Sequence, residues 1–217
     1  MTLKRGKFIT FEGVEGGGKS TQIQRLADWF REQGREVLVT KQPGGTAIGS
    51  QIRQTLLHVD HAHMEPWCEA LLYLADRAQH VRQVIEPHLS RGVWVLCDRY
   101  QDSTVVYQGV ARQVDSGLID AIYQQAALGL KPDLTIILDL DVTTGVARAR
   151  SRNVELQLSQ AEGRFEEEDL SFHRAVREGF IQLAAREPHR VRLVDATEDA
   201  EHVFQLVRDA CEAVVHV

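Results

Sequence analysis

Nine residues near the start of the chain, from Gly13 to Thr21, constrain the fold more than any other segment. They read Gly13-Val14-Glu15-Gly16-Gly17-Gly18-Lys19-Ser20-Thr21 and match the pattern GxxxxGK[ST]. An apolar run, Phe8 to Phe11, precedes them and predicts a buried strand. In such a loop the glycines let backbone N–H groups surround a polyphosphate, and the next helix presents its positive end to the anion. The segment therefore predicts a strand, a P-loop and a helix, with a nucleoside triphosphate as ligand.

Two side chains of this loop, and two residues far from it in sequence, have predicted phosphate chemistry. We expect Lys19 to place its charge at the β- and γ-phosphates and the Ser20 hydroxyl to ligate Mg²⁺. Asp98 follows the apolar run Val93 to Cys97, the Walker-B arrangement in which a carboxylate supports the metal, although a strand-end Asp can also cap a turn. Arg99 comes next, and an arginine beside the metal acid favours a phosphotransferase with a phosphorylated acceptor over a simple hydrolase.

Strands and helices alternate along the chain. The five apolar runs that predict strands are Phe8 to Phe11, Val37 to Val39, Val93 to Cys97, Leu134 to Leu140 and Val191 to Val194. Segments with helical spacing separate them, including a long one that ends near Leu89. This order predicts an α/β chain with a three-layer P-loop NTPase fold, in which helices flank a five-stranded parallel sheet. We expect one domain, residues 1–217, with its ligands at the carboxyl ends of the strands.

The charge and composition of the chain restrict the binding partners and the cellular location that we expect for it. The 217-residue chain carries 25 basic and 31 acidic residues, a net charge of −6, which argues against a nucleic-acid partner. Of the 25 basic residues five are lysines and 20 are arginines, a bias that suits bidentate phosphate binding or reflects genomic base composition. No apolar stretch approaches the ~20 residues of a membrane span. The three cysteines form no CxxC pair, and the basic N-terminus is not a signal peptide, so a cytoplasmic location is expected.

Four motifs resemble those of bacterial thymidylate kinases (dTMP kinases), and the likeness runs from about residue 7 to about residue 210. The motifs are Phe11-Glu12-Gly13-Val14-Glu15-Gly16, Gln42-Pro43-Gly44-Gly45-Thr46, Asp98-Arg99-Tyr100 with its extension to Tyr107-Gln108-Gly109, and Lys131-Pro132-Asp133-Leu134-Thr135. The chain departs from the family pattern at Lys41-Gln42, where Arg-Glu is usual, and at Val142, where proline is usual. Lys41 keeps a positive charge without the arginine fork, and we expect no specific role for Gln42.

The resemblance implies residues for the phosphate and sugar of the acceptor. Arg53 and Arg99 match arginines that hold the acceptor phosphate, although Arg53 could also be an exposed helical arginine. Tyr107 matches a ring that crowds the sugar 2′ position and disfavours ribonucleotides. Glu15 matches an acid near the sugar 3′-hydroxyl and the metal. An acid inside a phosphate loop is otherwise electrostatically unfavourable, which supports a functional reason for it.

The resemblance also implies residues for the base. Tyr73 matches an aromatic residue that stacks on thymine, although an aromatic on a helix often belongs to the core. Arg77 lies four residues further, on the same helix face, and matches an arginine that hydrogen-bonds the base. Thr104 and Gln108 match polar positions that read the base edge.

A basic segment, about residues 148–166, resembles the mobile lid of the family. Arg148, Arg150 and Arg152 are spaced by two, which cannot place all three on one helix face and predicts a helix end that breaks into a loop. Arg164 follows a polar stretch. The alternative for each of these arginines is that it belongs to a solvent-exposed charged loop and has no catalytic role.

The family divides by the source of its transition-state arginine, which is either a basic residue in the P-loop or an arginine of the lid. Gly16 and Gly17 occupy the loop here, so the chain resembles the lid-arginine group. Arg152 and Arg164 are the candidates, together with Lys19 and Arg99 as charge-neutralising residues. Arg148 is expected nearer the adenine or phosphates of ATP.

The resemblance implies an ATP- and Mg²⁺-dependent phosphorylation of dTMP to dTDP, in dTTP synthesis, by a homodimer joined through its long helices. The partners would be small nucleotides and neither nucleic acid nor membrane. Two alternatives stay open: another nucleoside monophosphate or deoxynucleoside kinase of this fold, and a regulatory P-loop protein that uses ATP as a switch.

Overall fold

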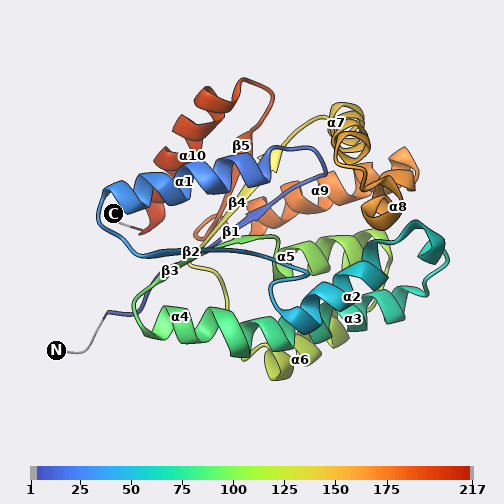
Figure 1. Cartoon of the computed structure of the whole chain (residues 1–217), viewed down its shortest axis with the longest axis horizontal. Coiled ribbons are helices and arrows are strands. Elements are labelled where there is room, and N and C mark those ends of the chain that lie inside the picture. Colours follow the sequence, from blue (N-terminus) through green and yellow to red (C-terminus); the bar gives the residue numbers. More distant parts are fainter. Residues whose placement is uncertain (1–3, 216–217) are drawn as a thin grey trace.

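A parallel β-sheet lies at the centre of the structure, a computed structural model that describes residues 4–215 (Figure 1). Across the sheet the strands follow the order β2 (Val37–Lys41), β3 (Trp94–Asp98), β1 (Phe8–Glu12), β4 (Leu134–Asp139) and β5 (Val191–Asp195). All neighbouring pairs are parallel. The predicted α/β fold class is confirmed, and every predicted strand is present with its ends shifted by at most two residues.

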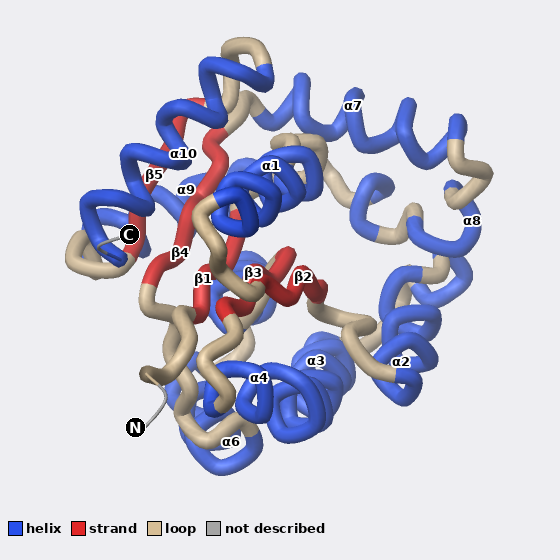
Figure 2. Tube along the Cα trace, turned by 60° about the vertical axis from the view of Figure 1, so that its left-hand side comes forward, coloured by secondary structure: helices blue, strands red, loops and turns tan. Residues whose placement is uncertain are grey.

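Helices cover both faces of the sheet (Figures 1 and 2). One face carries α1 (Lys19–Glu32) and α10 (Ala200–Val215). The other carries α3 (Pro66–His80), α4 (Glu86–Ser90), α6 (Ser116–Ala126) and α9 (Leu170–Arg186). Beyond the carboxyl ends of the strands lie α2 (Ala47–Leu57), α5 (Gln101–Thr104), α7 (Val142–Glu155) and α8 (Ser159–Glu162). Since these helices surround one edge of the sheet, they are placed to form a ligand site there.

The core explains why the strands read as continuous apolar runs. In β1, Ile9 and Phe11 pack against α1, while Phe8 packs on the opposite face with Leu89 and Tyr123. Both side-chain directions of the strand are therefore buried, as in sheets covered on two faces. None of the helices found between residues 4 and 215 combines the length and the apolar composition that a membrane crossing needs.

The long helix predicted to end near Leu89 is present in three joined parts. The helix α3 passes through a π-helical turn, Val81–Ile85, into α4. In the same way α5 continues into a π-helical segment, Val105–Ala111. These two helical rods carry most of the polar residues predicted to bind the acceptor.

The helix that carries Arg148, Arg150 and Arg152 ends three residues beyond Arg152, and the predicted change from helix to loop follows there. The helix α7 begins at Val142, where the Asp141 side chain accepts a hydrogen bond from the Thr144 backbone N–H, and it runs without interruption to Glu155. The three arginines therefore point in different directions from one helix. The break comes later, where Gln157 adopts a positive φ of 57° before α8.

Candidate active site

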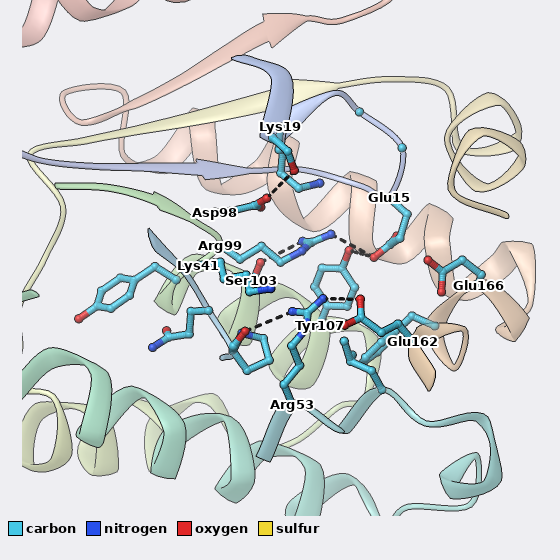
Figure 3. A pocket seen from close by; sticks show the side chains of 18 of the residues that line it. Glu15, Lys19, Lys41, Arg53, Asp98, Arg99, Ser103, Tyr107, Glu162 and Glu166 are labelled. Atoms are coloured by element: carbon cyan, nitrogen blue, oxygen red, sulfur yellow. Dashed lines mark hydrogen bonds and ion pairs between the residues drawn. The ribbon is translucent and has the colours of Figure 1, made fainter. Parts of the chain in front are cut away.

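A cavity of about 570 Å³ opens at the carboxyl ends of the strands, between the P-loop, α2, α3 and the α7–α8 segment (Figure 3). Residues far apart in the sequence meet here. All of the residues that the sequence predicted for the site line this cavity except Gly13, Val14 and Arg164. A single concave space thus contains both the phosphate loop and the groups predicted to bind an acceptor.

The P-loop turns into α1 through Gly18, which adopts a left-handed φ of 84°. The Lys19 Nζ atom folds back onto the loop, donating to the carbonyl oxygen of Val14 at 2.7 Å and to that of Gly13 at 3.3 Å. Burial of the ammonium, helped by the nearby charge of Arg99, lowers the pKa of Lys19 to about 8. A bound polyphosphate would relieve this cost, because it supplies negative charge to a buried cation.

A glycine pair explains why the P-loop carries no basic residue at position 16. Gly16 has a φ of 68°, and a Cβ atom there would lie 2.1 Å from the carbonyl oxygen of Gly145 in α7. A Cβ on Gly145 would in turn lie 2.5 Å from the carbonyl oxygen of Glu15. The loop and α7 therefore touch through their backbones, and a side chain at either position would force them apart.

The two predicted metal ligands lie together. The Ser20 hydroxyl donates to the Asp98 carboxylate at 3.1 Å, which places two oxygen ligands next to the P-loop. Oxygen ligands suit Mg²⁺, which proteins usually hold through one or two carboxylates and the phosphates of the substrate. Within residues 4–215 no three His, Cys, Asp or Glu side chains cluster as a dedicated metal cage. The donor set fits a metal that arrives with a nucleotide.

Arg99 connects the P-loop to the acceptor side of the cavity. Its Nη1 donates to the carbonyl oxygen of Gly13 at 3.0 Å and to the Ser103 hydroxyl at 3.1 Å, and its Nη2 donates to Glu15 at 3.1 Å. Its backbone adopts a positive φ of 64°, uncommon for a residue with a side chain. This conformation turns the chain sharply at the end of β3.

Glu12, for which the sequence predicted no role, stabilises this turn through hydrogen bonds. Its carboxylate is fully buried and accepts hydrogen bonds from the Tyr100 backbone N–H at 2.7 Å and from the Ser103 hydroxyl at 2.5 Å. Burial, followed by the charge of Asp102, raises the pKa of Glu12 to about 7. Only its place in the Phe11-Glu12-Gly13 motif could have pointed to it.

Glu15 faces the cavity from the P-loop and is ringed by donors. Its Oε1 accepts from Arg99 and from the Tyr107 hydroxyl at 2.5 Å, and its Oε2 lies 3.3 Å from Nδ1 of His173. Burial alone would raise the pKa of Glu15, but His173, Arg99 and Lys19 together lower it well below its usual range. His173 is fully buried on α9 and was missed, because a lone histidine in a helix carries no motif.

The predicted base-binding residues line one side of the cavity. Tyr73 and Arg77 come from the same face of α3, as their spacing predicted. The Thr104 hydroxyl is buried without a hydrogen-bond partner among the described residues, and the Gln108 amide donates to Glu69 at 2.7 Å. An unpaired buried hydroxyl at a cavity wall suits a ligand with polar edges.

Arg53 lies within the cavity, and a carboxylate occupies its fork (Figure 3). Its Nε and Nη2 each donate to Glu162 of α8 at 2.8 Å, and its Nη1 donates to the carbonyl oxygen of Pro43 at 3.2 Å. A carboxylate and a phosphate bind an arginine fork in the same bidentate way. The polar stretch before Gly163 offered no signal for Glu162.

The lid arginines separate into two groups. Arg148 and Arg152 line the cavity, and the Arg152 side chain is about half exposed and donates to Asn153 at 2.9 Å. Arg164 instead lies outside the cavity with its side chain 1% exposed, and its Nη2 is 2.7 Å from the buried Glu69 carboxylate. Arg150 points elsewhere and donates to the carbonyl oxygen of Glu166.

Comparison with known proteins assigns the family. The family model described as thymidylate kinase matches residues 11–207. The chain is 50% identical over 196 residues to a thymidylate kinase of Syntrophotalea carbinolica, with 90% of each chain covered, and 50% identical over 204 residues to one of Geobacter sulfurreducens, with 94% of this chain and 95% of the other covered. The chain belongs to the thymidylate kinase family. A crystal structure of thymidylate kinase from Ehrlichia chaffeensis agrees, with a TM-score of 0.76, 29% identity, and coverage of 94% of this chain and 98% of that one.

Membership of the thymidylate kinase family makes this chain a nucleotide-binding phosphotransferase and confirms the resemblance read from its motifs. One residue at which the motif departs from the family pattern turns out to be structural. Gln42 is 2% exposed, and its Oε1 accepts a 2.6 Å hydrogen bond from Nε of Arg77. The expectation that Gln42 has no specific role is therefore wrong.

Proposed function

We propose that this chain transfers the γ-phosphoryl group of ATP to dTMP, giving dTDP and ADP within dTTP synthesis. One observation carries the proposal: a P-loop and a second anion site share one cavity, and Arg99 lies between them. A simple hydrolase needs no acceptor site beside its P-loop. Membership of the thymidylate kinase family supports dTMP as the molecule that fills it.

The ATP site is the P-loop from Gly13 to Thr21. Its backbone N–H groups bind the phosphates, Lys19 neutralises charge on the β- and γ-phosphates, and Arg148 approaches the nucleotide from α7. Ser20 and Asp98 would hold Mg²⁺, which neutralises charge on the phosphate oxygens when bound.

Arg53 and Arg99 bind the acceptor phosphate in this proposal. Arg99 already contacts the P-loop, so a phosphate held by it lies close to the transferred group, and positioning of this kind supplies much of the catalysis of phosphoryl transfer. The phosphate takes over the Arg53 fork from Glu162. Glu15 and Tyr107, joined by a hydrogen bond, face the sugar, so the acid accepts from its 3′-hydroxyl and the ring crowds the 2′ position.

Tyr73 stacks on the thymine ring, and Arg77, Thr104 and Gln108 bind its edge. All four side chains line the cavity. Arg77 and Gln108 belong to buried hydrogen-bond networks, and Thr104 has a free hydroxyl within the described structure. Thymine offers carbonyl acceptors that suit the donors of Arg77.

Residues 148–166 act as the lid of a single domain spanning residues 1–217, and Arg152 supplies the transition-state arginine. Arg152 lines the cavity with its side chain about half exposed and only a long 3.6 Å ion pair to Glu166, whereas Arg164 is buried against Glu69. Closure of the lid over both nucleotides excludes water, so the phosphoryl group reaches dTMP and not solvent.

The kinase acts as a cytoplasmic homodimer. Three large apolar side chains are exposed on neighbouring elements of one face: Leu71 on α3, Val110 after α5, and Leu118 on α6, each 41–48% exposed. An apolar surface over the long helices suits a second copy of the chain. Leu71→Asp is expected to shift the species seen by light scattering from dimer to monomer, and an unchanged mass would reject this interface.

The test of the activity is acceptor-dependent turnover. Purified protein with ATP and Mg²⁺ should produce ADP and dTDP in equal amounts when dTMP is added. Lys19→Met is the matched control and should abolish turnover while leaving the fold intact. If UMP, CMP or a deoxynucleoside stimulates ADP formation and dTMP does not, the chain is a different kinase of this fold. Slow hydrolysis that ignores every acceptor would instead identify an ATP-dependent switch.

A further inference from the structure

A buried polar cluster lies beneath the base side of the cavity, where the chain departs from the family pattern at Gln42. It joins Thr40 and Gln42, at the end of β2, to Arg77 and His80 of α3. Gln42 is 2% exposed, Arg77 1% and His80 0%. Of the four, Gln42 and Arg77 line the cavity, whereas Thr40 and His80 lie behind them.

We propose that Gln42 and His80 are positioning residues that fix the Arg77 guanidinium and thereby set the selectivity for the acceptor base. The proposal rests on the proposed function, because it concerns the pocket that binds the base. It adds two residues that act through Arg77 and touch no substrate themselves.

The hydrogen bonds of the cluster have only one consistent direction. A guanidinium only donates, so the Gln42 atom 2.6 Å from Nε of Arg77 must be its carbonyl oxygen. The Gln42 NH₂ group then points to Nδ1 of His80, at 3.3 Å. This nitrogen must accept, so the ring proton sits on Nε2 and is donated to the Thr40 hydroxyl at 2.8 Å.

The imidazole is neutral, as this direction requires. Burial, followed by the charge of Arg77, lowers the pKa of His80 to about 4. The ring is also held in place by packing, because a Cβ atom on Gly45 would lie only 2.3 Å from its Nε2. A neutral ring that cannot turn gives the Gln42 amide one favoured orientation, with its oxygen towards Arg77.

The remaining contacts of Arg77 show why this matters. Its Nη1 donates to the Gln101 side chain at 2.7 Å and its Nη2 to the carbonyl oxygen of Tyr100 at 3.0 Å. All three acceptors are neutral, so the guanidinium is held by geometry and not by a hydrogen-bonded carboxylate. Loss of the Gln42 acceptor would leave the Nε–H of a buried cation unpaired and let the side chain shift.

The experiment compares Gln42→Met, which removes the acceptor at similar length, with Gln42→Glu, which keeps an acceptor oxygen. His80→Phe removes the imidazole acceptor for the Gln42 amide and leaves the buried Asp76 carboxylate beside it. Steady-state kinetics with dTMP and dCMP measure selectivity, because thymine presents a carbonyl acceptor where cytosine presents an amino donor. Thermal unfolding of each variant verifies that it folds.

For Gln42→Met and His80→Phe we expect the KM for dTMP to rise about ten-fold and the preference for dTMP over dCMP to fall by a similar factor. The KM for ATP and the kcat should stay within about two-fold, because the ATP site is untouched. Gln42→Glu should retain wild-type KM and selectivity. A merely structural role would lower the melting temperature without changing selectivity.

Nitrogen NMR of His80 in the wild-type protein gives a second readout that needs no variant. The expected signal is a neutral ring protonated at Nε2, and protonation at Nδ1 would overturn the hydrogen-bond direction and with it the proposal. Unchanged KM and selectivity in Gln42→Met would also overturn it. Wild-type protein without dTMP-dependent turnover would refute the proposed function, whereas normal turnover with unaltered selectivity in the variants refutes only the positioning role.

Discussion

Exchange of single lid arginines for methionine should separate catalysis from stability. Arg164→Met removes a buried partner of Glu69, whose side chain is 0% exposed. Loss of one partner from a buried ion pair costs about 3–5 kcal/mol. Glu69 keeps the Gln108 amide at 2.7 Å and Arg112 at 3.5 Å, so we expect the lower end, about 3 kcal/mol. For a chain of this size that corresponds to a fall in melting temperature of about 6–12 °C.

Arg152→Met should behave in the opposite way. The Arg152 side chain is 52% exposed, hydrogen-bonds the adjacent Asn153 and forms a long 3.6 Å ion pair with Glu166, so its removal should change stability by at most about 1 kcal/mol. An arginine that meets the transferred phosphoryl group is worth about 10³–10⁵ in rate, so kcat should fall by at least 10³. Arg174→Met, at an exposed arginine on α9, is the control and should alter neither quantity.

The assays are thermal unfolding and turnover at saturating ATP and dTMP, at a temperature where all three variants are folded. We expect a low melting temperature with near-normal kcat for Arg164→Met, and a near-normal melting temperature with low kcat for Arg152→Met. If Arg164→Met instead kept its melting temperature and lost kcat by a thousand-fold, the buried pair with Glu69 would be a resting contact. Arg164 would then be the transition-state arginine.

Three further predictions concern the carboxylates and the ring of the site. Because the pKa of buried Glu12 is raised to about 7, its stabilising effect is full below pH 4.5 and is lost as the pH rises to 7. Between pH 4.5 and pH 7 the free energy of unfolding of Glu12→Gln, measured in urea, should rise relative to that of the wild type by up to about 3 kcal/mol. A constant difference between the two proteins across this pH range would contradict the prediction. Glu162→Gln frees the Arg53 fork and should lower the KM for dTMP about five-fold, and an unchanged KM would show that Glu162 does not compete with the phosphate. Tyr107→Ala should relax discrimination against ribothymidine monophosphate by about ten-fold while Tyr107→Phe, which keeps the ring, should not, and equal selectivity in the two would reject the steric role.

The fold followed from periodicity and from a single motif. The P-loop requires a strand before it and a helix after it, and four further apolar runs separated by helical segments leave little choice but a parallel sheet. The strand ends moved by one or two residues, since strand pairing extends into polar residues such as Glu12 and Asp98. The end of helix α7 likewise lies a few residues beyond its three arginines, because the helix is held by the Asp141 cap and by packing, neither of which depends on how the arginines are spaced.

The site was predictable where chemistry is encoded in adjacent residues and unpredictable where it depends on tertiary contact. In the P-loop and in the segment from Asp98 to Gly109, a single turn of the backbone sets the positions of the side chains. The motif in the sequence therefore predicts which of these side chains lie in the site. Glu162, His173 and His80 reach the site from helices that carry no motif. Arg164 is the opposite case: it was a candidate for the site because it lies in the lid segment, but its side chain is buried against Glu69 and lies outside the cavity.

Buried electrostatics explain how an acidic chain binds two phosphorylated ligands. A net charge of −6 acts at long range and is screened by salt, whereas the cavity arginines act over a few ångströms. Two of them already have oxygen partners that a ligand can replace or extend: Glu162 on Arg53, and Glu15 with the Gly13 carbonyl on Arg99. Holding a cation ready against an internal acceptor avoids the cost of an unpaired buried charge before the nucleotide arrives. Binding is then an exchange of partners, so the affinity for dTMP depends as much on how weakly Glu162 holds Arg53 as on how well the phosphate fits.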